Sequence, residues 1–330
     1  MPVYNASRYV AEAIESILNQ TLSDFEFIII DDCSTDDTCD IINTYTDRRI
    51  ILICKQVNTG IISSLNLGIS IAKGQFIARM DGDDISDVNR LGKQVDFMHL
   101  NPEITVCGTW FRLIPSNQII DYPGSNEAIK IAFLDFCAIG HPTAMIRTDF
   151  IRAKKLEYDP SFKSAEDYDL WTRIASAGKF ANIPEPLLSY RLHAGQVSIT
   201  DHDNQVKHSH LCRLRMINYL LGTSGEKDVE LSNLSFYNDN IVNIDSLLEV
   251  INWLNKLLAL NESKNFYNLN LFAEYIENKK KNITGHFYLK RAMNNPRTLY
   301  YFIKMHKYLK DSYNFSERLK FGVKCLAWWN

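Results

Sequence analysis

Three carboxylates within four residues mark a place where this chain could hold a cation. The run Asp81-Gly82-Asp83-Asp84 directly follows residues 75–80, which are typical of a strand. Carboxylates this close repel one another unless water or a cation neutralises them, and their hard oxygens suit Mg²⁺ or Mn²⁺. Such an ion commonly bridges one or two carboxylates and a substrate diphosphate. A solvated aspartate-rich turn would use the same residues, so the run alone leaves both interpretations open.

A second acidic pair lies at the end of another predicted strand. Asp31 and Asp32 follow the apolar run 25–30 and precede a predicted helix over 35–45. Their oxygens could accept hydrogen bonds from a nucleobase imide or a ribose hydroxyl. Acidic residues are also favoured at the start of a helix, so a turn without any ligand is an equal alternative.

The segment Glu166–Arg173 carries three carboxylates into an amphipathic helix. A carboxylate held near a diphosphate could act as the general base for an acceptor hydroxyl. The structural alternative is charge at a helix N-terminus with an ion pair between Asp169 and Arg173, and spacing does not decide between the two. His193 follows a strand-like run over 183–190 that could bring it to the rim of a site, although isolated histidines are more often structural.

Two hydrophobic periodicities alternate over the first ~110 residues, as expected for strands and helices in turn. Helices are expected over 7–18, 35–45, 61–72 and 87–100, and strands over 25–30, 50–54, 75–80 and 104–107. Short connections between alternating elements predict the α/β class, with an open, mostly parallel sheet flanked by helices. Ligands bind beyond the carboxyl ends of strands in such sheets, so the two acidic clusters should meet at one edge.

Two features of the chain's organisation complete this prediction. Residues 1–5 are typical of the loop after a first strand, so we expect that strand to be missing from the sheet. From about residue 204 the pattern is helical and glycine is rare. We therefore predict an α/β domain over 1–203 and a helical C-terminal region over 204–330.

Composition restricts the classes of partner. The formal net charge of −3 and pI near 6.3 give no case for nucleic-acid binding, and the seven cysteines show no CxxC pair typical of zinc sites. The sequence shows no signal peptide and no apolar run long enough to span a membrane, so a cytoplasmic protein is expected. Residues 297–330 combine aromatic side chains with a basic excess. This stretch is either a helix packed on the rest or a peripheral contact with the inner face of the cell membrane.

A set of short motifs occurs in a fixed order along residues 2–193. They are Pro2-Val3-Tyr4-Asn5, Ser16-Ile17-Leu18-Asn19-Gln20, Ile30-Asp31-Asp32-Cys33-Ser34-Thr35-Asp36, Asn58-Thr59-Gly60, Leu65-Asn66-Leu67-Gly68-Ile69, Ala72-Lys73-Gly74, Ala78-Arg79-Met80-Asp81-Gly82-Asp83-Asp84, His141-Pro142-Thr143, Ala165-Glu166-Asp167-Tyr168-Asp169-Leu170-Trp171 and Tyr190-Arg191-Leu192-His193. In these motifs the chain resembles the inverting glycosyltransferases of family 2, which have the GT-A fold. The resemblance is strongest to bacterial members that build capsule, O-antigen or lipooligosaccharide chains.

The resemblance implies a donor site for a nucleotide sugar. The residues that it places around the nucleotide and donor sugar are Pro2, Tyr4, Asn5, Asp32, Asn58, Gly60, Asp81 and Asp83. Within this set, Asp32 would accept a hydrogen bond from the nucleobase imide. One departure concerns Ser63-Ser64, which stand where many relatives carry a basic residue.

The resemblance also implies a metal site and a catalytic base. Asp83 and Asp84 would hold Mn²⁺ or Mg²⁺ on the diphosphate, with His193 approaching the ion. Asp167 would deprotonate the acceptor, and Glu166 is the second choice for that role.

The function implied is transfer of a sugar of the hexose type from a nucleoside-diphosphate donor, expected to be a UDP-sugar. The acceptor would be a hydroxyl of a glycan or lipid-linked molecule in bacterial surface polysaccharide synthesis. The alternative is a catalytically silent protein that binds nucleotide sugars or assists assembly.

Overall fold

The computed structural model describes residues 1–193, 201–288 and 296–304, and the chain divides into two compact units. The first unit is Met1–Cys212 and the second is Arg213–Asn330. The division falls inside a helix, α9 (His202–Leu221), which also spans the boundary expected at 203/204.

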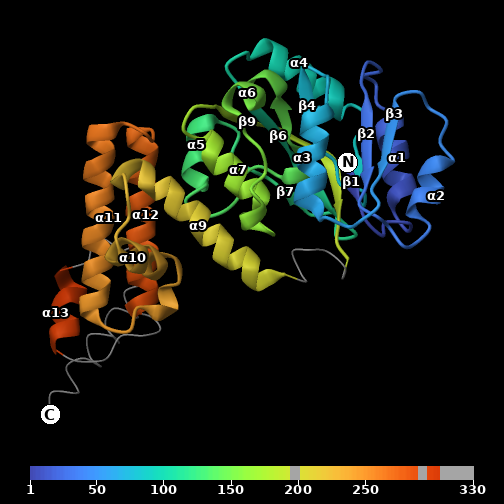
Figure 1. Ribbon diagram of the computed structural model, residues 1–330. Helices are drawn as coiled ribbons and strands as arrows, with labels where there is room; N and C mark the ends of the chain where they lie inside the picture. The colour runs from blue at the N-terminus through green and yellow to red at the C-terminus, as the bar shows by residue number, and fades with distance from the viewer. Residues whose placement is uncertain (194–200, 289–295, 305–330) are drawn as a thin grey trace. The chain divides into compact units, whose positions relative to one another are not determined.

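The first unit has the strands and helices of an α/β protein (Figure 1). Its described strands are β1 (Pro2–Val3), β2 (Phe27–Asp31), β3 (Ile50–Cys54), β4 (Phe76–Ala78), β5 (Ile85–Ser86), β6 (Val106–Ile114), β7 (Ile119–Ile120), β8 (Met145–Arg147) and β9 (Phe180–Arg191). Its described α-helices before α9 are α1 (Val10–Leu18), α2 (Thr38–Asn43), α3 (Ile61–Ile71), α4 (Arg90–Leu100), α5 (Asn126–Ala132), α6 (Thr148–Lys154) and α7 (Glu166–Ile174).

The strands form two sheets rather than one. The first is parallel, in the order β1-β2-β3. The second runs β4-β8-β6-β9-β5, and in it β6 pairs parallel with β9 while the other pairings are antiparallel. The α/β class is as predicted, but the second sheet is mixed, whereas the sequence predicts a mostly parallel one. The antiparallel partners β8 and β9 come from residues 110–200, where the sequence has no clear alternation of helix and strand.

The first strand is short but present, which differs from the expectation that it is missing. Val3 lies opposite Asp31 in the parallel pairing, and its carbonyl accepts a hydrogen bond of 2.9 Å from the backbone N–H of Asp32. The loop after β4 reaches the same place, because a Cβ on Gly82 would lie only 2.7 Å from Cγ1 of Val3. Both acidic segments therefore flank the carboxyl end of β1.

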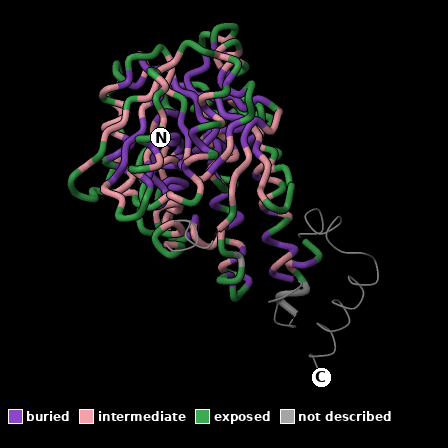
Figure 2. The backbone as a smooth tube through the Cα atoms, turned by 90° about the vertical axis from the view of Figure 1, so that its right-hand side faces the viewer, coloured by how far each residue is buried: buried purple, intermediate pink, exposed green. Residues whose placement is uncertain are grey.

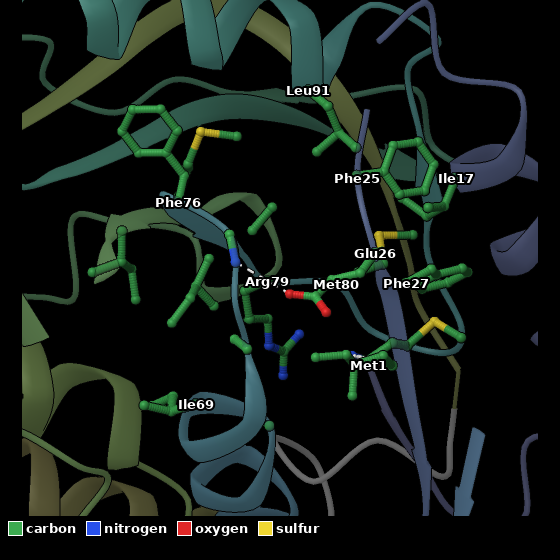
Figure 3. Close-up of a pocket in the computed structure, with 18 of the residues that line it drawn as sticks. Met1, Ile17, Phe25, Glu26, Phe27, Ile69, Phe76, Arg79, Met80 and Leu91 are labelled. Atoms are coloured by element: carbon green, nitrogen blue, oxygen red, sulfur yellow. Dashed lines mark hydrogen bonds between the residues drawn. The ribbon is translucent and has the colours of Figure 1, made fainter. Parts of the chain in front are cut away.

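A cavity of about 650 Å³ lies between β2 and β4 (Figure 3). Backbone and side chains of both strands line it, including Phe27 and Phe76, and Met1 lies at one end. In register, β1 pairs only with Ile30 and Asp31 of β2, so the earlier part of that strand faces the cavity. The cavity thus borders the part of β2 that lies before its pairing with β1.

The core of the first unit forms where helices cover the sheets. Ile14 of α1 and Ile29 of β2 are fully buried in one apolar cluster, which also includes Met80 at the end of the segment after β4. Figure 2 shows buried segments gathered inside this unit, with exposed loops around them. Burial of α1 through one apolar face follows from its helical spacing of Val10, Ile14 and Ile17.

The second unit is helical, as the sequence predicts. After α9 it contains α10 (Glu226–Phe236), α11 (Ile244–Lys264), α12 (Leu269–His286) and α13 (Pro296–Lys304). Helices α11 and α12 pack side by side (Figure 1). Within the described residues, no helix is both long and apolar enough to cross a membrane. The predicted membrane contact at 297–330 falls largely outside the described residues, which end at Lys304.

Candidate active site

The three aspartates after β4 form one cluster. Asp81, Asp83 and Asp84 each offer a carboxylate oxygen, and these oxygens lie within 4.8 Å of one another. Asp84 is fully buried; its Oδ1 accepts a hydrogen bond of 2.9 Å from the backbone N–H of Arg191, while Oδ2 has no hydrogen-bond partner. Burial, together with the charges of Asp81 and Asp83, raises the pKa of Asp84 well above its usual value.

This cluster fits a divalent cation. A buried carboxylate oxygen without a partner is costly, and two more carboxylates beside it add repulsion. One compensating group is the buried guanidinium of Arg79, which forms an ion pair with Asp81. Hard oxygen ligands grouped in this way are the donor set that Mg²⁺ and Mn²⁺ use, so the residues present suit the predicted metal.

The end of β9 brings a histidine to the cluster. Nε2 of His193 lies 2.8 Å from Oδ2 of Asp83, and the His193 ring packs on Tyr9 at 5.1 Å between centroids. Arg191 donates a hydrogen bond of 2.9 Å from Nε to the carbonyl of Asp83 and pairs with Glu12 at 2.6 Å. The structure therefore brings the predicted residues His193 and Asp83 together, and shows Arg191 fixing the backbone of the same loop.

Asp32 lies in a pocket of donors at the carboxyl end of β2. Its carboxylate accepts hydrogen bonds from Gly60 N at 2.7 Å, Thr59 N at 3.1 Å and Lys55 Nζ at 2.9 Å. Burial alone would raise the pKa of Asp32, but the bonds from Thr59, Lys55 and Gly60 outweigh it and lower the pKa. Asp32 is therefore ionised and rigidly placed, with little acceptor capacity left for a ligand.

Asn5 closes the neighbouring loop after β1. Its backbone N–H donates to Ser34 Oγ at 2.9 Å, and its Oδ1 accepts from Thr35 N at 2.8 Å. The Asn5 backbone has a positive φ of 48°, a conformation that asparagine tolerates better than most residues. These bonds tie the loop after β1 to the loop after β2.

The other predicted donor-site residues lie near the same strand ends. Pro2 is in β1, and Tyr4 beyond it is 50% exposed. Asn58 Oδ1 accepts a hydrogen bond of 3.2 Å from Gly60 N, so both residues belong to the loop that holds Asp32. The predicted nucleotide-binding residues thus share one surface of the first unit.

Lys55 was not singled out from the sequence. Its ammonium contacts Asp32 and also donates to Ser64 Oγ at 2.8 Å, which supplies a basic group beside Ser63-Ser64. The sequence signal was available, because Lys55 directly follows the predicted strand 50–54 and so lies at the same carboxyl edge.

Glu166 and Asp167 are the first two residues of α7. Burial and then the charge of Asp167 raise the pKa of Glu166 to about 7, and burial also raises the pKa of Asp167. Asp167 Oδ2 accepts from the thiol of Cys137 at 3.6 Å. Asp169 differs, since it pairs with Arg173 at 2.7 Å. Asp169 thus forms the ion pair of the structural interpretation, whereas the pKa of Glu166, about 7, lets that residue exchange a proton near neutral pH, and the pKa of Asp167 is raised by burial.

The positive charge of Arg79 acts both on the acidic cluster after β4 and on the Glu166–Asp167 pair. Arg79 pairs with Asp81, and its positive charge acts to lower the pKa of both Glu166 and Asp167. A second buried arginine, Arg90, fixes the Arg79 backbone by donating to its carbonyl at 3.1 Å. Glu166 and Asp167 therefore lie within the electrostatic reach of the same buried cation that pairs with the acidic cluster.

Comparison with known proteins agrees with this geometry. Residues 1–147 match the model of the family described as Glycosyl transferase family 2. A protein named as an uncharacterized glycosyltransferase from Haemophilus influenzae is 33% identical over 236 residues, covering 67% of this chain and 73% of its own length. The O-antigen biosynthesis glycosyltransferase WbnJ of Escherichia coli is 38% identical over 205 residues, covering 58% of this chain and 78% of WbnJ.

Solved structures show the same fold. Residues 1–349 of S. aureus TarS, in complex with UDP-GlcNAc, align with a TM-score of 0.57 at 17% identity, over 88% of this chain and 90% of that one. The mannosyltransferase PcManGT from Pyrobaculum calidifontis, in complex with GDP-Man and Mn²⁺, aligns with a TM-score of 0.54 at 13% identity, over 96% and 85% of the two chains. The predicted resemblance is confirmed: this chain is a glycosyltransferase of family 2 with the GT-A fold.

Proposed function

We propose that this chain is a metal-dependent, inverting glycosyltransferase that uses a UDP-sugar as donor. Its acceptor is a hydroxyl of a glycan or lipid-linked molecule in the synthesis of a bacterial surface polysaccharide. Residues 1–203 carry the chemistry and residues 204–330 form a helical region outside it. Contact of 297–330 with the inner face of the cell membrane belongs to the same proposal.

One observation carries the metal dependence: the fully buried Asp84, whose Oδ2 has no hydrogen-bond partner. Asp83 would be the second ligand, and His193, which contacts Asp83, would lie beside the ion. Mn²⁺ or Mg²⁺ held there would offset the negative charge of the departing nucleoside diphosphate. Asp81 already pairs with Arg79, so it would not be a ligand of the ion and could contact the donor sugar.

In the catalytic step, Asp167 takes the proton from the acceptor hydroxyl as that oxygen bonds to the anomeric carbon of the donor. The glycosidic bond to the diphosphate breaks in the same displacement, and the configuration inverts. The raised pKa of Asp167 suits this role, because a base works best when its pKa lies close to the working pH. Glu166 is the second candidate for the base.

The names of similar proteins support the choice of donor and acceptor. TarS was solved with UDP-GlcNAc, and E. coli WfaP is named as an enzyme that uses UDP-Glc and a diphosphoundecaprenol-linked acceptor. WfaP is 32% identical over 213 residues, which cover 64% of this chain and 82% of WfaP. A UDP-sugar and a lipid-linked acceptor follow as the first substrates to test.

The test is slow hydrolysis of UDP-sugars in Mn²⁺ together with binding of UDP. We expect hydrolysis by the native chain, its loss in Asp84→Ala, and in Asp167→Asn loss of transfer with UDP binding retained. Glu103→Gln, an exposed carboxylate outside the site, is the matched control and should behave as the native chain. Binding of UDP by the native chain without turnover of any UDP-sugar or acceptor would instead favour the silent, nucleotide-binding alternative.

A further inference from the structure

Two thiols meet beside the nucleotide side of the site. Cys39, the second residue of α2, and Cys54, the last residue of β3, place their Sγ atoms 2.9 Å apart. A disulfide bond measures about 2.05 Å, so a shift of about 0.9 Å would bring the two sulfurs to bonding distance. Both are free thiols in the structure.

The surroundings leave this thiol pair accessible. Cys54 is exposed and Cys39 is half-buried, so an oxidant can approach from solvent. Asp31 lies opposite Cys54 in the strand register, with a carboxylate oxygen within 4.8 Å of both sulfurs. Asn43 Nδ2 lies 3.6 Å from Sγ of Cys39, so polar groups of β2 and α2 flank the pair.

We propose that Cys39 and Cys54 are a modification site, at which a small disulfide such as oxidised glutathione converts the two thiols into a reversible intrachain disulfide. In the first step the Cys39 thiolate attacks one sulfur of oxidised glutathione; a mixed disulfide forms and one glutathione thiolate leaves. In the second step the Cys54 thiolate attacks the Cys39 sulfur, the intrachain bond forms and the second glutathione leaves. The two thiols lose two protons and two electrons, and both are gained by the oxidised glutathione.

The order of attack follows from the surroundings of Cys54. Burial and then the neighbouring Cys39 and Asp31 raise the pKa of the Cys54 thiol to about 12. That thiol therefore stays protonated at neutral pH, and Cys39 is the first nucleophile. Capping of Cys39 removes only the contribution of that thiol to the raised pKa of Cys54, and the second attack follows from the 2.9 Å between the two sulfurs.

The bond would fix the far end of the loop between β2 and α2, which lies at the carboxyl edge of the first sheet. This loop, residues 32–37, begins after Asp31 and ends where α2 begins, and Ser34 Oγ bonds to Asp31 Oδ1 at 2.5 Å. Joining α2 to β3 closes the chain over residues 39–54 and limits the unfolded ensemble. By the usual scale for such a loop, the oxidised chain should melt roughly 5–10 °C higher than the reduced one.

The experiment incubates the full chain at pH 8 with reduced and oxidised glutathione in varied ratio, quenches with acid, and maps peptides by mass spectrometry. We expect a Cys39–Cys54 link, the loss of two thiols per chain, and full reversal by dithiothreitol. Cys54→Ser should trap glutathione on Cys39, whereas Cys39→Ser should leave no link. Cys33→Ser, a half-buried cysteine of the same loop, is the matched control and should oxidise as the native chain.

The proposal fails if the mapped disulfide joins another pair, if Cys33→Ser abolishes the link, or if no link forms at any ratio. None of these measurements depends on sugar transfer. The failure of this proposal can therefore be distinguished from the failure of the proposed glycosyltransferase activity. A lower Tm for the oxidised chain than for the reduced chain would show that the disulfide does not stabilise the fold.

Discussion

Nε2 of His193 lies 2.8 Å from Oδ2 of Asp83, although 110 residues of sequence separate them. A histidine that orients or shares a metal-binding carboxylate typically changes metal affinity by about 10–100-fold when it is removed. We therefore expect His193→Ala to weaken Mn²⁺ binding by that factor. Titration of free Mn²⁺ by electron paramagnetic resonance, with UDP present, measures the effect.

His99→Ala is the control for that experiment, because His99 lies outside the site and contacts Gln75 at 3.2 Å. It should bind Mn²⁺ as the native chain does. Equal Mn²⁺ affinity in His193→Ala and the native chain would remove His193 from the metal site.

Asp84→Asn should raise the Tm of the metal-free chain. It should also abolish the change in Tm that Mn²⁺ causes in the native chain. The amide keeps an oxygen that accepts from Arg191 N, but it removes a buried charge that Asp81 and Asp83 repel. Replacing such a charge often stabilises by about 1–4 kcal/mol, which corresponds to a rise in Tm of a few degrees. Melting curves with and without MnCl₂ measure both effects. A lower metal-free Tm, or a Mn²⁺ shift as large as that of the native chain, would contradict the assignment.

Sugar transfer should fall as the pH drops through the range in which Glu166 and Asp167 become protonated. Glu166, with a pKa of about 7, and Asp167, with a raised pKa, bind protons at the start of α7, and a protonated base cannot accept the acceptor's proton. Asp167→Asn should reduce kcat by about 10²–10⁴-fold with UDP affinity unchanged. The pH dependence of kcat/KM between pH 5 and 9 provides the measurement.

Glu166→Gln separates the roles of the two carboxylates. It removes one negative charge next to Asp167, so the acid limb of kcat/KM should move to lower pH while activity at high pH is retained. Loss of activity at all pH values in Glu166→Gln, with Asp167→Asn still active, would identify Glu166 as the base instead.

Lys55→Met should weaken UDP binding. The ammonium holds the nearly buried Asp32 at 2.9 Å, and its removal leaves that carboxylate with one donor fewer and with a higher pKa. Loss of a hydrogen-bonded charge pair of this kind costs about 1.5–3 kcal/mol, or roughly 10–100-fold in affinity if all of it appears in binding. Calorimetry with UDP tests this, and Lys73→Met, an exposed lysine after α3, is the control. Unchanged UDP affinity in Lys55→Met would exclude a role for the ion pair.

The sequence was sufficient wherever an element depends on local pattern. The predicted strand 50–54 coincides with β3, and the predicted helix 61–72 differs from α3 by one residue. Asp83 and His193 were also predicted as neighbours at a metal site, and the structure places them in contact, although their binding of a metal remains a prediction. Hydrophobic spacing and ordered motifs carry this information without reference to distant contacts.

Elements that depend on distant partners were not predictable in this way. The two residues of β5 form a strand only because they pair with Ser189 and Leu188 of β9. Arg90 has the charge of a surface residue, yet its guanidinium is buried where it donates to the carbonyls of Arg79 and Pro142. No local pattern encodes either partner, whereas the position of Lys55 directly after the predicted strand 50–54 did indicate the sheet edge that it shares with Asp32.

The hydrogen bond from Arg191 N to Asp84 has a consequence for synthesis on the ribosome. The two residues lie 107 positions apart, so the acidic cluster leaves the exit tunnel long before its donor does. At about 5–20 residues per second, that interval lasts roughly 5–20 s. During this time the β1-β2-β3 sheet can already form from residues 1–54, whereas the aspartates remain without the strand that completes their site. A nascent chain would therefore form the β1-β2-β3 sheet first and complete the hydrogen bonding of the acidic cluster only after β9 emerges.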